Sequence, residues 1–123
     1  MQNRFKFRVW NQDSKKMVYH DFYIDCDGNL YEENFSDEGW DEGVFLFDNG
    51  IIMQCTGLKD KKGQLIYEGD ICTTHGYVGE IKWSDDYSGH IFKHLDADGD
   101  CSLSGCEPIN IIGNIYQSQE LLK

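Results

Sequence analysis

The stretch RFKFRVW, residues 4–10, alternates between cationic and apolar side chains as far as Val9. A period of two is typical of a β-strand that packs one face against a core, and it places Phe5, Phe7 and Val9 on one face. We expect the opposite, basic face to meet solvent or nearby carboxylates. This stretch therefore predicts the first of several half-buried strands.

Short apolar segments separated by turn residues continue along the chain, which has 13 glycines and only 1 proline. Such punctuation is typical of many short strands joined by tight turns. Further strands are expected at residues 17–25, 30–31, 44–47, 51–55, 65–74 with a break at Gly69, 77–83, 88–94 and 109–116. Hairpin turns are expected at Asp27-Gly28, at residues 48–50 and at residues 84–86.

The segments between these strands are polar. We expect turns at residues 11–16 and 59–64, a loop or short helix at 32–43, a loop at 96–107, and one helical turn at 117–123 with Ser118 as N-cap. No long helical pattern separates two strands, so a parallel β–α–β architecture is not expected. The sequence predicts a mainly β fold: a small barrel or two packed antiparallel sheets of short strands, with at most short helical turns.

Composition indicates one domain with a real core. The chain has 123 residues, of which 40% are hydrophobic, and a disordered chain would be poorer in apolar residues. No apolar run approaches the roughly 20 residues of a membrane helix, and the charged start does not resemble a signal peptide. The 5 cysteines are irregularly spaced and no second pair joins Cys101 and Cys106, so we expect reduced thiols, no zinc and a cytoplasmic location.

Acidic residues outnumber basic ones by 22 to 11, which gives a net charge of −11. This balance opposes binding to nucleic acid, which needs cations on the phosphates. Lys and Arg are absent from Met17 to Leu58, and that stretch holds ten acids: Asp21, Asp25, Asp27, Glu32, Glu33, Asp37, Glu38, Asp41, Glu42 and Asp48. Two interpretations remain open: a solvated face with loops, or an anionic surface that meets a basic partner.

The segment TGLKDKKGQLIYEGDI, residues 56–71, resembles the signature of the YopX family, which comprises small proteins of phages and prophages of Gram-positive bacteria. Residues 4–10, 112–116 and 120–122 are similar to the family's end blocks. The resemblance implies a single β-rich YopX-like domain over residues 1–123, a viral or prophage origin, and therefore the cytoplasm of a host cell. It implies no activity.

The central block also has a physical interpretation. Gly57 and Gly63 bracket a loop, and Gly69 marks a bend in a strand. Glu68 and Asp70 flank that bend. They are either carboxylates that accept backbone N–H bonds or a paired-carboxylate site. We expect a structural role for the motif residues Gly57, Gly63, Tyr67, Glu68, Gly69 and Asp70.

The segment DADGDCSLSGCE, residues 96–107, places oxygen ligands as a twelve-residue calcium loop does. Asp96, Asp98 and Asp100 hold positions 1, 3 and 5, and Glu107 holds position 12. Cys101 replaces the glycine that such a loop needs at position 6, and the two flanking helices are not expected. The alternative is an exposed hairpin loop, for which Asp and Gly are ordinary residues. Apart from calcium here, no cofactor is expected.

Other constellations are weaker. His90 and His94 share a strand face and with Asp96 form either a metal site or an exposed polar face. The aromatic residues, including Trp10, Trp40 and Trp83, form a core or a stacking platform for bases, and the charge favours the core. Phosphate loops, dinucleotide fingerprints and serine elbows are missing, so the sequence identifies no catalytic residue.

The leading hypothesis is a non-catalytic protein-interaction module with an acidic surface, which binds a host or phage protein. One version is DNA mimicry, in which carboxylates imitate phosphates. The alternative is a metal-binding domain or small metal-dependent enzyme that uses the Asp96–Glu107 loop. A third interpretation is self-assembly through exposed edge strands, which would give a homo-oligomer. Neither nucleic acid nor a membrane is an expected partner.

Overall fold

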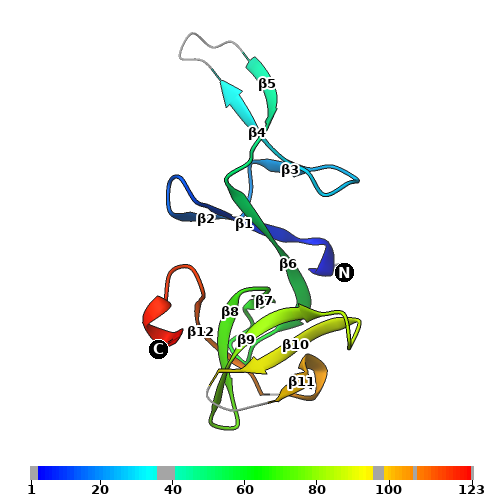
Figure 1. The fold of residues 1–123 in the computed structure, drawn as a ribbon, viewed down its shortest axis with the longest axis vertical. Helices are drawn as coiled ribbons and strands as arrows, with labels where there is room; N and C mark the ends of the chain where they lie inside the picture. The colour runs from blue at the N-terminus through cyan, green and yellow to red at the C-terminus, as the bar shows by residue number, and fades with distance from the viewer. Residues whose placement is uncertain (1–2, 36–40, 96–98, 107, 123) are drawn as a thin grey trace. The chain divides into compact units, whose positions relative to one another are not determined.

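The structure is a computed structural model that describes residues 3–35, 41–95, 99–106 and 108–122 (Figure 1). Over these residues the chain is mainly β, with antiparallel strands and three short 3₁₀ turns, η1 Asn3–Phe5, η2 Leu103–Gly105 and η3 Gln119–Leu122. The predicted fold class is therefore confirmed. The chain forms two compact units: a smaller unit, Arg8–Ile52, and a larger unit, Met1–Phe7 with Met53–Lys123.

The larger unit contains a five-stranded antiparallel sheet, in the order β11-β10-β9-β8-β12. Its strands are β8 Asp70–Thr74, β9 Tyr77–Ser84, β10 Gly89–His94, β11 Asp100–Ser102 and β12 Asn110–Asn114. Strand β7, Leu65–Tyr67, pairs with β6, Gly50–Lys59, with Cys55 opposite Tyr67. The predicted hairpin of residues 77–94 is confirmed, since β9 pairs with β10 from Ser84–Gly89 to Gly79–His94.

One apolar cluster forms the core of the larger unit: Ile66, Cys72, Ile81, Phe92, Leu103, Cys106 and Ile109. Phe92 is fully buried, and it lies over Gly79 of the neighbouring strand. A Cβ atom on Gly79 would lie 2.5 Å from the ring of Phe92. Glycine is therefore required here by close approach of a side chain.

The smaller unit holds a hairpin and a three-stranded sheet. Strand β1, Phe7–Asn11, pairs with β2, Lys16–Val18, and β4 lies between β3 and β5. The bounds of the latter three are β3 Phe22–Ile24, β4 Leu30–Phe35 and β5 Asp41–Leu46. Val9, Trp10 and Leu30 are buried. Strands β1 and β6 each run through both units.

The first predicted strand is wrong in its start and its exposed face. Residues 3–5 form η1, and β1 begins only at Phe7. Arg8 is buried, with its Nη1 donating to the Tyr19 hydroxyl at 3.4 Å, whereas Phe5 is 59% exposed. Neighbours cover both faces of β1, and its alternation therefore does not divide core from solvent.

Three further expectations on the smaller unit are wrong. Residues 17–25 form two strands, because the chain turns at Asp21, where φ is 67°. The described residues of the range 32–43 are not a loop, since 32–35 belong to β4 and 41–43 to β5. The hairpin at residues 48–50 does not form: β5 pairs with β4, and β6 pairs with β7.

The Asp27-Gly28 hairpin is confirmed, but its turn is longer than two residues. Strand β3 pairs with β4, and the Asp25 N–H donates to the Asn29 carbonyl at 3.0 Å. Gly28 alone among the turn residues has a positive φ, at 86°, whereas a type I′ turn needs two. Asp25 explains the difference, because its carboxylate accepts the N–H groups of Asp27 and Asn29 and stabilises the wider turn.

The other boundaries agree in part. The break at Gly69 and the helical turn near the C-terminus are confirmed. The Ser118 hydroxyl, which was expected to cap that turn, accepts the N–H of the preceding Asn114 at 3.3 Å. The loop expected at residues 96–107 contains β11 and η2. The strand expected at residues 109–116 is shorter, since β12 covers Asn110–Asn114, and its Ile112 is 39% exposed.

Candidate functional site

The turn between β6 and β7 is organised by Asp60, which is buried. Its Oδ1 accepts the N–H groups of Lys62 and Gln64, both at 2.9 Å, and its Oδ2 accepts that of Ile111 at 3.3 Å. Burial opposes the charge, but these backbone donors outweigh it and lower the pKa of Asp60. Asp60 therefore fastens the turn to β12. Sequence reasoning missed this role, although an Asp three residues before Gly63 is a turn signal.

Glu68, Gly69 and Asp70 form the tight connection between β7 and β8. Gly69 has φ +88°, a left-handed conformation that favours glycine. The buried Asp70 accepts the Tyr67 N–H at 2.8 Å, and Glu68 Oε1 accepts the Gln54 N–H at 2.8 Å. Both carboxylates thus bind backbone donors within the larger unit.

Glu68 also contacts an imidazole. Its Oε2 lies 3.0 Å from His90 Nε2, and the two side chains are 24% and 11% exposed respectively. Burial raises the pKa of Glu68, but the hydrogen bonds from His90 and from the Gln54 N–H reverse this, and the net pKa is lowered. Glu68 therefore remains a carboxylate that joins β10 to the β7–β8 turn.

The two histidines have different neighbours. The ring of His94 packs edge-on against Tyr77 and Phe92, with centroids 5.0 and 5.2 Å away, whereas His90 contacts Glu68 and Trp83. Asp96, the third member of the metal set predicted with these histidines, lies outside the described residues. Within the described part of the chain, no three His, Cys, Asp or Glu side chains are grouped to hold a metal ion.

The candidate calcium loop is described only in part. Asp96, Asp98 and Glu107 lie outside the described residues, and calcium binding by this loop stays a prediction. Asp100 begins β11 opposite Lys93, and its carbonyl accepts the Tyr87 hydroxyl at 3.4 Å. Position 5 of the expected loop therefore belongs to a paired strand.

Cys101 and Cys106 are joined as a disulfide, whereas the sequence predicts reduced thiols. Turn η2 reverses the chain between them and brings the two sulfur atoms together. Their Cα atoms are 7.1 Å apart, slightly beyond the usual disulfide range. Cys106 Sγ also lies 3.2 Å from the Ser102 carbonyl oxygen. The expectation of reduced thiols is therefore wrong for this pair, whereas among the described residues no disulfide includes Cys26, Cys55 or Cys72.

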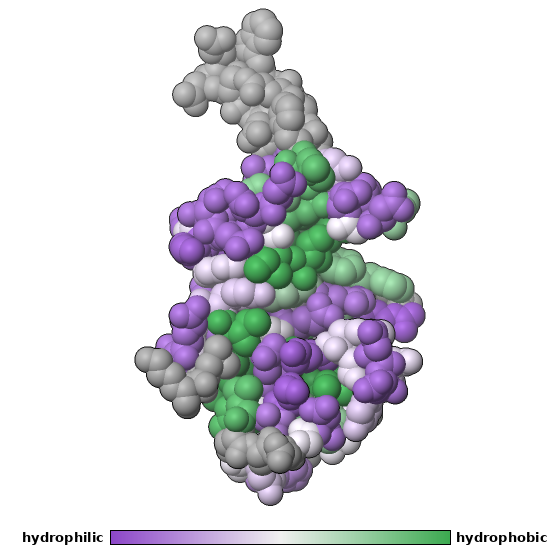
Figure 2. Space-filling model, in the orientation of Figure 1, coloured by the Kyte–Doolittle hydropathy of each residue, from purple (hydrophilic) through white to green (hydrophobic). Residues whose placement is uncertain are grey.

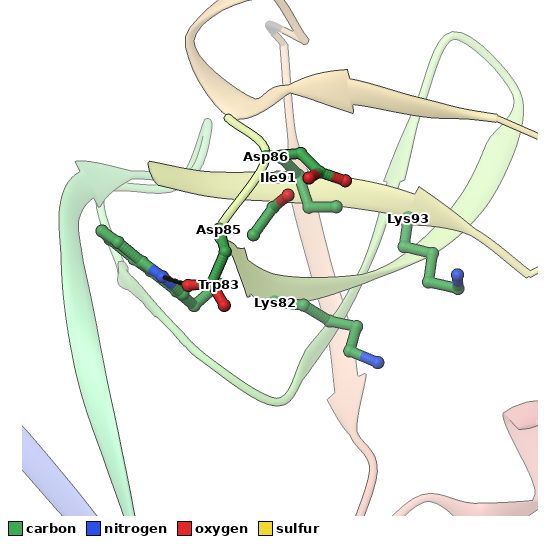
Figure 3. A pocket seen from close by; sticks show the side chains of 7 residues that line it. Lys82, Trp83, Asp85, Asp86, Ile91 and Lys93 are labelled. Atoms are coloured by element: carbon green, nitrogen blue, oxygen red, sulfur yellow. Dashed lines mark hydrogen bonds between the residues drawn. The ribbon is translucent and has the colours of Figure 1, made fainter. Parts of the chain in front are cut away.

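A shallow hollow of about 370 Å³ lies on the β9–β10 hairpin (Figure 3). Its lining residues are Lys82, Trp83, Ser84, Asp85, Asp86, Ile91 and Lys93. In Figure 3, Trp83 and Asp85 lie together at one end, and the ammonium groups of Lys82 and Lys93 lie at the other. Trp83 is 51% exposed, so the expectation that the tryptophans form the core is wrong at this position.

The surface of the larger unit is mixed. On the face seen in Figure 2, hydrophilic residues surround smaller hydrophobic areas. Half-exposed aromatic side chains also lie at the two ends of the β9–β10 hairpin: Tyr77, Trp83 and Tyr87. Over the described residues no helix has the length and hydropathy needed to cross a bilayer.

A family model described as YopX protein matches residues 6–123. The chain belongs to the YopX family. It is similar to protein EF1440 from Enterococcus faecalis, whose crystal structure superposes with a TM-score of 0.61 at 26% identity, over 96% of this chain and 97% of that one. No curated protein matches.

A second solved structure supports the fold. Protein yopX from Bacillus subtilis superposes with a TM-score of 0.65 at 22% identity, over 98% of this chain and 99% of that one. In this YopX chain, Gly57 lies within β6, where its register against β7 shifts, Gly63 lies in the β6–β7 turn, and Tyr67–Asp70 connect β7 to β8. Sequence reasoning found these positions, but it missed Asp60 and the exposed indole of Trp83.

Proposed function

We propose that this YopX protein is a non-catalytic protein-interaction module, encoded by a phage or prophage, that acts in the host cytoplasm. Its partner is a host or phage protein with a basic surface. The partner contacts carboxylates and undergoes no chemical change. Membership of the YopX family supports the viral origin, because this family comprises small proteins of phages and prophages.

One observation carries this proposal: the absence of Lys and Arg from Met17 to Leu58, among ten acids. Of the five acids here whose side chains are described, Asp21, Asp25, Asp27 and Asp48 are exposed, and Glu32 is half-buried. Asp21 faces His20 and Asp25 stabilises its own turn, so Asp27 and Asp48 are the clearest candidates for a partner. Cations are missing from the same stretch, so a basic protein meets no like charge there.

The hydrogen bonds of three carboxylates argue against a paired-carboxylate site in the segment 56–71. Asp60, Glu68 and Asp70 accept backbone N–H groups, which fixes their orientation inside turns. Glu68 and Asp60 also have lowered pKa values, which suits permanent acceptors and does not suit general acids. These residues support the structural role expected of the family motif.

A tagged pull-down from lysate of the natural bacterial host tests the proposal. We expect a basic protein to be retained at low salt and released at high salt, because surface charges are screened. The Asp27→Asn/Asp48→Asn variant should retain less of it. An Asp100→Asn/Glu120→Gln variant, with the same charge change in the larger unit, is the control. Retention that depends on neither salt nor the smaller unit's acids would contradict the proposal.

DNA mimicry is the sharper version of this function. In that case the retained partner is a nucleic-acid-binding protein, and the YopX chain competes with duplex DNA for it. A competition assay with the purified partner separates the two versions: displacement of DNA supports mimicry, whereas simultaneous binding of DNA and the YopX chain rejects it.

A further inference from the structure

Trp83 is a large apolar side chain that the fold holds rigidly and leaves half exposed. Its Nε1–H donates to Asp85 Oδ1 at 2.9 Å (Figure 3). The ring of His90 lies edge-on to it, with centroids 5.3 Å apart and planes at 85°. His90 is itself bonded to Glu68 at 3.0 Å. A chain of contacts from the β7–β8 turn thus fixes the indole.

A fixed and half-exposed indole is available to a partner. Tryptophan is highly buried on average, and it is enriched among the residues that contribute most to binding at protein interfaces. Because two contacts already define the ring's position, little side-chain entropy is lost on binding. The observation therefore indicates a recognition surface at the tip of the β9–β10 hairpin.

The charge beside the indole selects the ligand chemistry. Asp85 accepts the hydrogen bond of the indole N–H, and Asp86 follows it in the same exposed hairpin tip. Lys82 and Lys93 lie at the other end of the hollow in Figure 3. A guanidinium group can stack on the indole face and donate to the adjacent carboxylate, whereas an anion would meet two carboxylates.

We propose that Trp83 and Asp85 form a receptor for an arginine side chain of a basic partner protein. The arginine lies over the indole and donates to the carboxylate of Asp85. This inference rests on the proposed function, since it names a contact for the same class of partner, but it locates that contact in the larger unit. It adds a specific anchor to an otherwise long-range attraction.

The test uses the full chain and a hexa-arginine peptide as the probe. We expect the peptide to shift the indole N–H resonance of Trp83, and hexa-lysine to bind more weakly. Trp83→Leu and Asp85→Asn should each weaken hexa-arginine binding about two- to fivefold, the effect of one exposed cation–π contact or ion pair. Tyr77→Leu, which removes a similarly exposed aromatic ring, and Asp100→Asn are the matched controls and should bind like the parent.

The outcomes separate this inference from the proposed function. If Trp83→Leu and Asp85→Asn bind like the parent while Asp27→Asn/Asp48→Asn binds more weakly, the receptor is wrong and the acidic stretch stands. If only the Trp83 and Asp85 variants matter, the receptor stands and the role of the acidic stretch is contradicted. No binding of hexa-arginine overturns the receptor. A dimer in native mass spectrometry that Trp83→Leu abolishes would also overturn it, because a second copy of the chain would then occupy the surface. A shift of the Trp83 resonance caused by single-stranded DNA would overturn it in favour of a nucleic acid.

Discussion

Glycines in the family motif hold backbone conformations that other residues avoid. Gly57, Gly63 and Gly69 have φ values of 87°, 87° and 88°. Open space surrounds the position of a Cβ atom on Gly63, so a substitution there causes backbone strain and no steric clash. The motif's glycines can therefore be tested for conformation separately from packing.

Gly63→Ala should lower the free energy of unfolding by about 1–2 kcal/mol, because alanine is strained in the left-handed region. Urea denaturation measures the change. Gly105→Ala is the matched control, since its Cβ also meets open space and its φ is not positive. Equal losses in the free energy of unfolding for the two substitutions would show that the positive φ of Gly63 does not make its substitution more destabilising.

The Glu68–His90 contact makes stability depend on pH. The pKa of Glu68 in the fold lies below its ordinary value of 4.5. Its carboxylate therefore stabilises the fold fully above pH 4.5, and this contribution is lost as pH falls through the lowered pKa. We expect the parent to be more stable than Glu68→Gln at neutral pH, and this difference in the free energy of unfolding to shrink as pH falls below 4.5.

Urea denaturation at several pH values measures the difference, with Glu120→Gln, a substitution of an exposed glutamate, as control. A difference that is constant with pH would exclude this role for the Glu68 charge.

At the scale of elements, Asp60 joins the β6–β7 turn to β12. Asp60→Ala removes the acceptor of three backbone N–H groups. These N–H groups are partly buried, and a buried donor left without a partner costs about 1–3 kcal/mol, so the free energy of unfolding should fall by about 2 kcal/mol. Thermal and urea unfolding check this, with the exposed Asp48→Ala as control. A loss below about 0.5 kcal/mol would mean that water replaces the carboxylate.

Local patterns predicted some elements and not others. The β9–β10 hairpin and the break at Gly69 depend on residues close in sequence, and both were predictable. Arg8 is buried because other strands cover both faces of β1, and a period of two cannot reveal such covering. Likewise, β5 and β6 are separated by a plausible turn but pair with different strands. Pairing choice depends on distant segments.

The candidate site was predictable to the same extent. The motif residues at the turns were found, because glycines with positive φ and flanking carboxylates leave a pattern in the sequence. The exposure of Trp83 was not predictable, because a tryptophan next to acids has the same pattern whether its ring faces the core or the solvent. The exposed fraction of its side chain, 51%, distinguishes the two.

At the scale of the whole molecule, the chain forms two compact units, and the single domain expected from the sequence stays a prediction. Strands β1 and β6 run through both units, so melting either unit disrupts a strand of the other. We therefore expect one cooperative unfolding transition. Urea titration followed by NMR should give the same midpoint for amides of β3–β4 and of β9–β10. Two separate midpoints would show that the units fold independently.

The interaction proposed for the whole molecule is electrostatic, and its salt dependence tests it most directly. The measurement is the dissociation constant of the complex with the recovered host partner, over a series of salt concentrations. We predict that affinity falls steeply with salt, and that Asp27→Asn/Asp48→Asn lowers both the affinity and the slope, while Asp100→Asn/Glu120→Gln changes them less. A salt-independent affinity, unchanged in the first variant, would contradict an acidic interaction module.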